Sequence, residues 1–180
     1  MPTMRSQGTL LRAARPAVLA AALLALATGC SSSGGAAGVQ REAPGAAQTT
    51  MRTGANGVSL SMKARNVDLE ITAATVSLAP SGSAYLDFTV DNLGPVTEHL
   101  ALVSVPGSGS GTLTGAAAGN GALSTAGIQI ASGGSTVFDA KAPSIVLPPV
   151  KGLKAGATLP VLLEFGIAGL VHLDVPVRAA

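Results

Sequence analysis

Three stretches of the chain alternate between apolar and polar residues with a period of two, the pattern of a β-strand that buries one face. One is 83–91, and the other two, 159–165 and 171–177, lie on either side of a glycine-flanked turn and predict a hairpin. Further short runs rich in Val, Ile and Thr predict more strands, separated by clusters of Gly, Pro and Ser. These runs are 58–62, 67–71, 75–78, 99–105, 127–131, 136–139 and 144–147. The sequence therefore predicts an all-β protein, a single immunoglobulin-like β-sandwich over residues 58–180.

The first 29 residues have the features of a secretory signal. Arg5, Arg12 and Arg15 precede an unbroken run of Ala, Val and Leu at 17–27, which is too short to span a bilayer as a helix. The run ends in A-T-G-C, which resembles the lipobox of bacterial lipoproteins. The resemblance implies that Cys30, the only cysteine, carries a diacylglycerol and further acyl chains such as palmitate, and that residues 1–29 are removed. The alternative is a soluble secreted protein with a free thiol.

Residues 30–57 contain Ser, Gly, Ala, Gln, Thr and Pro with almost no large apolar side chain. Such a composition does not bury enough surface to offset its ordering entropy, so we expect a lipid-anchored flexible tether. We therefore expect the protein on the extracytoplasmic face of the cell membrane, in the cell envelope.

Charge and aromatic content exclude a nucleic-acid partner. The chain has 11 basic and 9 acidic residues, but three of the basic ones lie in the signal, which leaves 8 against 9 and a net charge of −1 from Cys30 onwards. No basic stripe remains for phosphates. The four aromatic residues are too few for base-stacking platforms: Tyr85, Phe88, Phe138 and Phe165.

Four segments carry a family resemblance: G-S-A-Y-L-D-F-T-V-D-N at 82–92, H-L-A-L-V-S-V-P at 99–106, I-A-S-G-G-S-T-V-F at 130–138, and the closing run 150–177 with its L-K-A-G and D-V-P-V motifs. Together they resemble the PCu(A)C family of extracytoplasmic copper chaperones. The resemblance implies a cupredoxin-like β-sandwich, here in lipoprotein form.

The copper ligands of that family do not carry over. Its members hold Cu(I), a soft ion, with imidazole and thioether groups. The resemblance aligns Thr114 with the first His, Gly121 with the first Met, and Ser144 and Val146 with a His-x-Met pair. None of these four residues binds Cu(I). We therefore expect no cofactor, and a binding or interaction protein that contacts an envelope protein or metalloenzyme.

The alternative is a copper chaperone that delivers Cu(I) to an envelope metalloenzyme from a relocated site. Its candidate ligands are His99, His172 and Met62, with Met51 close to the tether. His172 and Asp174 are expected to share the outward face of the last strand, and His99 to lie at the rim.

Catalysis is not expected. A hydrolase needs a nucleophile beside an oriented base, and neither histidine has such a setting. The run G-S-G-S-G at 107–111 has the spacing of a nucleophile elbow, but no helix is predicted after it, and it lacks the lysine of a phosphate loop. Carboxylates such as Asp87 and Asp91 are expected on a solvated strand face. We interpret 107–121 as a mobile loop, and a third hypothesis is that it binds a small ligand or a wall polymer.

Overall fold

The computed structural model describes residues 48–180, which fold entirely as β-strands and connecting turns. The predicted signal peptide 1–29, Cys30 and most of the predicted tether lie outside the described residues. The strands are β1 (Gln48–Gly54), β2 (Gly57–Ala64), β3 (Val67–Leu78), β4 (Ala84–Asn92), β5 (Glu98–Val105), β6 (Gly109–Ser110), β7 (Thr112–Thr114), β8 (Leu123–Ser124), β9 (Gly127–Ile130), β10 (Ser135–Phe138), β11 (Ser144–Val146), β12 (Thr158–Phe165) and β13 (Gly169–Ala179). Over residues 48–180, no helix has the length and apolarity needed to cross a bilayer.

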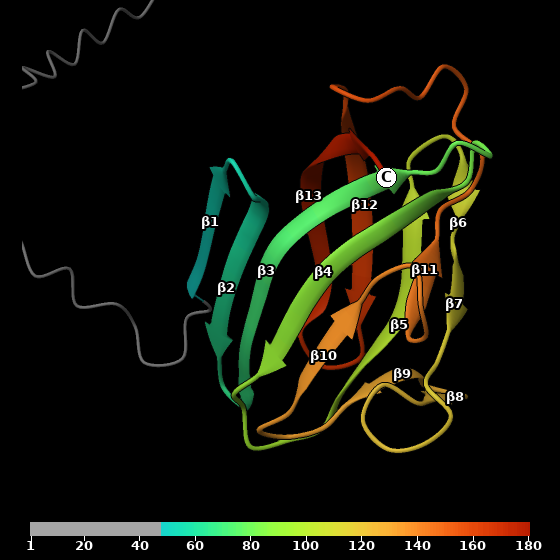
Figure 1. The fold of residues 1–180 in the computed structure, drawn as a ribbon. Coiled ribbons are helices and arrows are strands. Elements are labelled where there is room, and N and C mark those ends of the chain that lie inside the picture. The colour runs from blue at the N-terminus through green and yellow to red at the C-terminus, as the bar shows by residue number, and fades with distance from the viewer. Residues whose placement is uncertain (1–47) are drawn as a thin grey trace, which may run out of the picture. The chain divides into compact units, whose positions relative to one another are not determined.

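The strands form two packed layers that are joined by β13. One layer runs β1-β2-β3-β4, with β10 and β11 beside β4 and β7 beside β11. The other runs β13-β12-β5-β9-β8, with β6 also beside β5. The end of β13 pairs in parallel with β3, so the last strand closes the two layers into a barrel-like sandwich (Figure 1).

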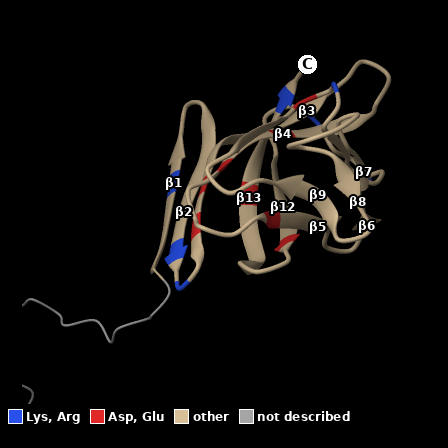
Figure 2. Ribbon diagram, turned by 90° about the horizontal axis from the view of Figure 1, so that it is seen from below, with Lys and Arg blue, Asp and Glu red and all other residues tan. Residues whose placement is uncertain are grey.

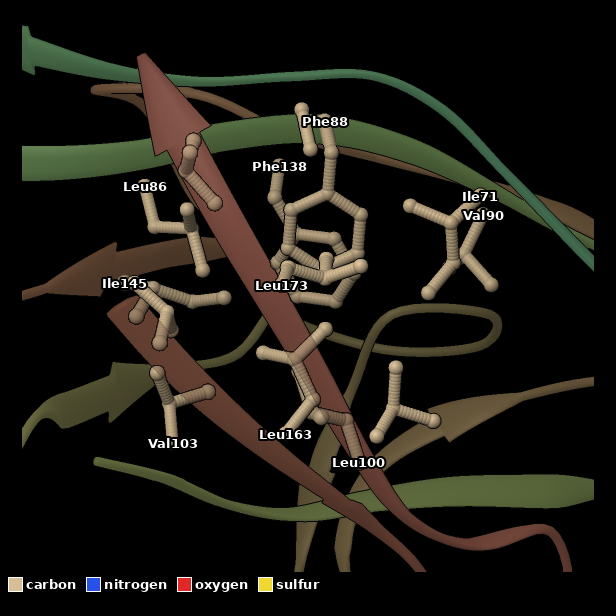
Figure 3. Packing of buried hydrophobic residues seen from close by; sticks show 14 of the residues in the cluster. Ile71, Leu86, Phe88, Val90, Leu100, Val103, Phe138, Ile145, Leu163 and Leu173 are labelled. Atoms are coloured by element: carbon tan, nitrogen blue, oxygen red, sulfur yellow. The ribbon is translucent and has the colours of Figure 1, made fainter. Parts of the chain in front are cut away.

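The core lies between the layers and is built from the apolar sets predicted by the period of two. In β4 the residues Ala84, Leu86, Phe88 and Val90 are all buried, and the intervening residues are not. Phe88 lies opposite Phe138 of β10, and their rings stack with centroids 4.7 Å apart (Figure 3). Two sheet faces that pack together and bury one side of the longer strands β2, β3, β4, β12 and β13 account for this arrangement.

Glu98, at the start of β5, ties that strand to the β12–β13 turn. Its side chain is only 3% exposed. The carboxylate accepts hydrogen bonds from the backbone N–H groups of His99 (2.8 Å), Ile167 (2.9 and 3.1 Å) and Ala168 (2.8 Å). A buried carboxylate is stable only when its oxygens are satisfied in this way.

Asn92 has a similar role at the end of β4. Its amide Nδ2 donates to the carbonyls of Val96 and Ile130, and its Oδ1 accepts from the N–H of Gly94. The side chain thus holds the β4–β5 connection against the end of β9.

The structure confirms the predicted all-β class and the positions of the predicted strands, with differences of two kinds. The first is that four strands were not predicted, β1 and the short strands β6, β7 and β8. Strand β1 lies inside the segment 30–57 that was predicted as a tether, so the first described strand begins at residue 48 and the first predicted strand at 58. All seven residues of β1 are exposed, and a strand that buries no face has no apolar alternation.

The second difference concerns β3. The predicted runs 67–71 and 75–78 form one continuous strand, interrupted only by a register shift against β4 between Thr72 and Thr75. Ala73 has a φ of 55° at this bulge. The break in the apolar pattern was therefore a bulge within a strand and not a turn between strands.

Candidate functional site

The positions that the family resemblance assigns to copper ligands lie together in this fold. Ser144 of β11 is directly opposite Thr114 of β7, and Val146 is opposite Thr112. Ile145, between the two β11 positions, is fully buried in the core. Because side chains alternate across a strand, Ser144 and Val146 share the opposite face with Thr114. On that face Thr114 is exposed, Val146 is half-buried and Ser144 is buried.

The position aligned with the first methionine is next to this group. Gly121 has a φ of 85°, and a Cβ built on it would lie 3.2 Å from Cγ of Pro143, the residue before Ser144. The loop that carries Gly121 therefore packs against the start of β11. The structure thus places Thr114, Ser144 and Gly121 at one end of the β7–β11 pair, and Val146 at its other end, two residues along β11 from Ser144.

The loop around Gly121 belongs to the segment predicted to be mobile, and in the structure it makes hydrogen bonds to residues 129–136. Asn120 donates from Nδ2 to the carbonyl of Ser135 (2.7 Å) and to Oγ1 of Thr136 (2.9 Å), and its Oδ1 accepts from the N–H of Ala131 (2.7 Å). Two backbone hydrogen bonds add to these: the N–H of Ala116 donates to the carbonyl of Gly121, and the N–H of Gly121 donates to the carbonyl of Gln129. One asparagine thus replaces the apolar contacts that a small-residue loop lacks.

The group of aligned positions offers hydroxyl, methyl and hydrogen in place of imidazole and thioether. Thr114 and Ser144 have neutral hydroxyl groups, which are poor ligands for a soft monovalent ion, and Gly121 and Val146 have no donor atom. Within residues 48–180, no three His, Cys, Asp or Glu side chains are grouped so that they could hold a metal ion. The residues at these positions do not fit Cu(I).

The two histidines proposed for a relocated site lie apart from each other. His172 is exposed on β13 opposite Leu162, and the carbonyl of His99 accepts from the N–H of Gly166. Leu162 and Gly166 are four residues apart, about 13 Å along an extended chain, so the two imidazoles do not share one ion. His172 and Asp174 are both exposed on the outward face of β13, as predicted.

The two methionines come closer together. Met62 is 8% exposed and lies opposite Thr49, and Met51 is 48% exposed and lies opposite Leu60. They are diagonal neighbours on one face of the β1–β2 hairpin, a relation that places Cα atoms about 7–8 Å apart. This pair is the only soft-ligand pair among the four candidates that the strand registers bring onto one face.

Asp87 is not a solvated surface residue as the sequence indicated. It is half-buried on β4 at a hollow of about 320 Å³ that Ser77, Tyr85, Asp139 and Lys141 also line. Its Oδ2 accepts a short hydrogen bond from the hydroxyl of Ser77, and its buried Oδ1 has no partner. Burial raises the pKa of the Asp87 carboxyl, the Ser77 hydrogen bond opposes the rise, and the negative charge of Asp139 adds to it.

Two larger hollows lie on the surface. One, of about 690 Å³, lies along the β1–β2 hairpin and includes Arg52 and Glu70, and the other, of about 730 Å³, lies between the β3–β4 turn and residues 146–150. Charged residues are sparse around both, and no continuous basic stripe appears over the described strands in this view (Figure 2). Across residues 48–180 the single ion pair is between Lys63 and Asp68.

Comparison with known proteins supports the fold. No protein-family model matches the chain, and no curated protein matches it. Among solved structures, the copper-bound PCuAC domain from PmoF2 is 19% identical with a TM-score of 0.52, and covers 62% of this chain and 93% of its own. The apo PCuAC domain from PmoF1 is 21% identical with a TM-score of 0.52, and the match covers 62% of this chain and 94% of that domain. The apo PmoF2 PCuAC domain is 20% identical with a TM-score of 0.50, and the match covers 62% of this chain and 90% of that domain.

These likenesses confirm the PCuAC-like, cupredoxin-like fold that the resemblance implied. At this level of identity they concern the fold alone, because one fold hosts many functions.

Proposed function

We propose that this protein is a lipid-anchored binding protein of the cell envelope, on the extracytoplasmic face of the membrane, that uses a copper-chaperone-like fold without the copper site of that fold. The observation that carries the proposal is the group formed by Thr114, Gly121, Ser144 and Val146. Strand pairing places these residues together, and none of them supplies a soft ligand. The lipid anchor rests on the A-T-G-C sequence at Cys30.

In this proposal the protein acts by contact and not by catalysis. Within the group of aligned positions Thr114 is exposed and Val146 is half-buried, whereas Gly121 and Ser144 are buried. The neighbouring loop is held by hydrogen bonds from Asn120 to Ser135 and Ala131, so the part open to contact is a small, fixed surface around Thr114. Such a surface suits contact with another envelope protein, for example a metalloenzyme during assembly, since a preformed surface loses little entropy on binding.

The experiment is a competition for Cu(I) with a chromophoric chelator, using the chain without residues 1–30. We expect the unaltered chain to leave the chelator complex intact. We expect the variant Thr114→His/Ser144→His/Val146→Met to withdraw copper, because these substitutions place two imidazoles and a thioether on one face of the β7–β11 pair. Thr114→His alone is the matched control, since one imidazole is too few. Copper withdrawal by the unaltered chain would refute the proposal.

A second candidate function is a copper chaperone with a relocated site, and the position of Met51 and Met62 on one face of the β1–β2 hairpin favours it. If the unaltered chain binds Cu(I), this candidate predicts that Met51→Leu/Met62→Leu abolishes the binding. His99→Ala/His172→Ala would leave it unchanged, because the two histidines lie on a different layer. The opposite pattern would assign the ion to the histidines.

A further inference from the structure

Among residues 48–180, strand β1 forms one border of the first layer, and residues 49–53 have no strand on the side away from β2. Within residues 48–180 it pairs only with β2, in an unbroken register that runs from Gln48 opposite Lys63 to Gly54 opposite Gly57. Every residue of β1 is exposed, and Figure 1 shows the strand at the border of its layer. A long strand with an unpaired backbone edge is a template for pairing with another strand.

The β1–β2 turn decides which backbone groups face that edge. Its two central residues are Ala55 and Asn56, so the pair Gly54 and Gly57 closes the turn and is hydrogen-bonded. Bonded and non-bonded positions alternate along an antiparallel pair. The N–H and C=O groups of Arg52 and Thr50 therefore point to β2, and those of Thr49, Met51 and Thr53 point to the open edge.

The edge lacks the features that protect exposed strands from pairing. Natural edges have proline, lysine, bulges or inward charges. Residues 49–53 contain no proline and a single charge, Arg52, and their register with β2 shows no bulge. In contrast, the β2–β3 and β3–β4 pairs inside the layer both have register shifts. Strand β1 is therefore the longest edge strand of this layer among residues 48–180, and its pairing with β2 has no irregularity.

The sequence of β1 is self-complementary about Met51. In an antiparallel pair centred on this residue, Met51 lies opposite Met51 of a second copy, and Thr49 opposite Thr53. Threonine pairs and apolar pairs directly across from each other stabilise antiparallel strands. Arg52 lies opposite Thr50, so the two guanidinium groups are not directly opposed. The same register aligns the outward N–H and C=O groups of the two strands with each other.

We propose that β1 pairs antiparallel with β1 of a second copy of this chain, with Met51 opposite Met51, so that the first layers of two molecules join into one sheet. The contact involves one short strand from each copy and is small, so the dimer is weak and concentration-dependent. If the chain is anchored in a membrane, as proposed above, the anchor raises the local concentration and favours the dimer. The pairing itself depends only on β1.

The test uses disulfide formation in the complete chain with Cys30→Ser, which removes the natural thiol. A disulfide needs Cα atoms about 4.4–6.8 Å apart, and directly opposed residues of an antiparallel pair satisfy this. We expect Met51→Cys to form a disulfide dimer on mild oxidation. Thr49→Cys and Thr53→Cys are matched controls, since each lies about 13 Å from its own copy in this register and is expected to stay monomeric. An equimolar mixture of the two is expected to form the mixed dimer.

Three outcomes overturn the proposal: no dimer of Met51→Cys, equal dimer formation by all three single variants, or no mixed dimer of Thr49→Cys with Thr53→Cys. A second measurement uses Met51→Pro, which removes an N–H that faces the open edge and leaves the bonds to β2 in place. In sedimentation at rising concentration, the Cys30→Ser chain is expected to dimerise and the Met51→Pro variant to stay monomeric with unchanged circular dichroism. Equal sedimentation of the two chains also overturns the proposal. Loss of the dimer leaves the copper result of the previous section untouched, so the two proposals fail separately.

Discussion

Replacement of Glu98 tests the most specific polar contact in the fold. Its carboxylate is buried and accepts from three backbone N–H groups, those of His99, Ile167 and Ala168. In Glu98→Ala these three donors lose their acceptor. An unsatisfied buried donor costs about 1–3 kcal/mol. Water can enter the space that the side chain leaves, and the desolvation cost of the carboxylate disappears. We therefore take the lower end of this energy range for each of the three donors.

The expected loss for Glu98→Ala is about 3 kcal/mol of unfolding free energy, from three donors at about 1 kcal/mol each. Glu98→Gln keeps one oxygen but turns an amide NH₂ toward a backbone N–H, so we expect a loss of about 1–2 kcal/mol. Glu164→Gln is the matched control, because Glu164 is exposed on β12 and its change is expected to lie within about 0.5 kcal/mol.

Urea unfolding, followed by circular dichroism, measures these free energies from the shift of the midpoint urea concentration when the m-value is unchanged. The reasoning predicts the order Glu98→Ala, Glu98→Gln, Glu164→Gln from the largest loss to the smallest. A Glu98→Gln variant as stable as the unaltered chain would show that the carboxylate is not needed to satisfy the turn. A loss in Glu164→Gln equal to that in Glu98→Gln would show that charge alone matters.

Three further predictions concern single positions. Asp87→Asn is expected to stabilise the chain at pH 7, because burial raises the pKa of the Asp87 carboxyl and so penalises its charged form in the folded state. That gain is expected to shrink as the pH falls through the raised folded pKa and to vanish below the ordinary value of 3.8, where Asp87 is protonated in both the folded and the unfolded chain, and melting curves at pH 7 and below 3.8 check it. Asn120→Ala removes three hydrogen bonds to Ser135, Thr136 and Ala131, so amide hydrogen exchange is expected to speed up in 115–122 and not in β12. Gly115→Ala places a Cβ 2.1 Å from the backbone N of Leu123 and is expected to lower the melting temperature, whereas Ala118→Gly, at an exposed position of the same loop, is expected to change it little.

The period of two predicted the fold because most strands bury one face. β4, β12 and β13 have clean alternation, and each was found within one or two residues of its predicted bounds. β1 was missed because both of its faces are exposed, so hydrophobicity carries no signal there. The role of Glu98 was missed for a related reason: its partners are backbone groups 69 and 70 residues away, at Ile167 and Ala168.

The copper-ligand positions show why the fold was predictable and its chemistry was not. In β11 the inward Ile145 is fixed by the core, and any change of its volume affects packing. Ser144 and Val146, with Thr114 across from Ser144, are placed by the same backbone pairing on the face turned away from Ile145, where Ser144 is buried, Val146 half-buried and Thr114 exposed. A chain can therefore keep the geometry of a metal site and lose every ligand without losing the fold. By the same argument, ligands restored on that face should bind Cu(I), because the backbone that would position them is still present.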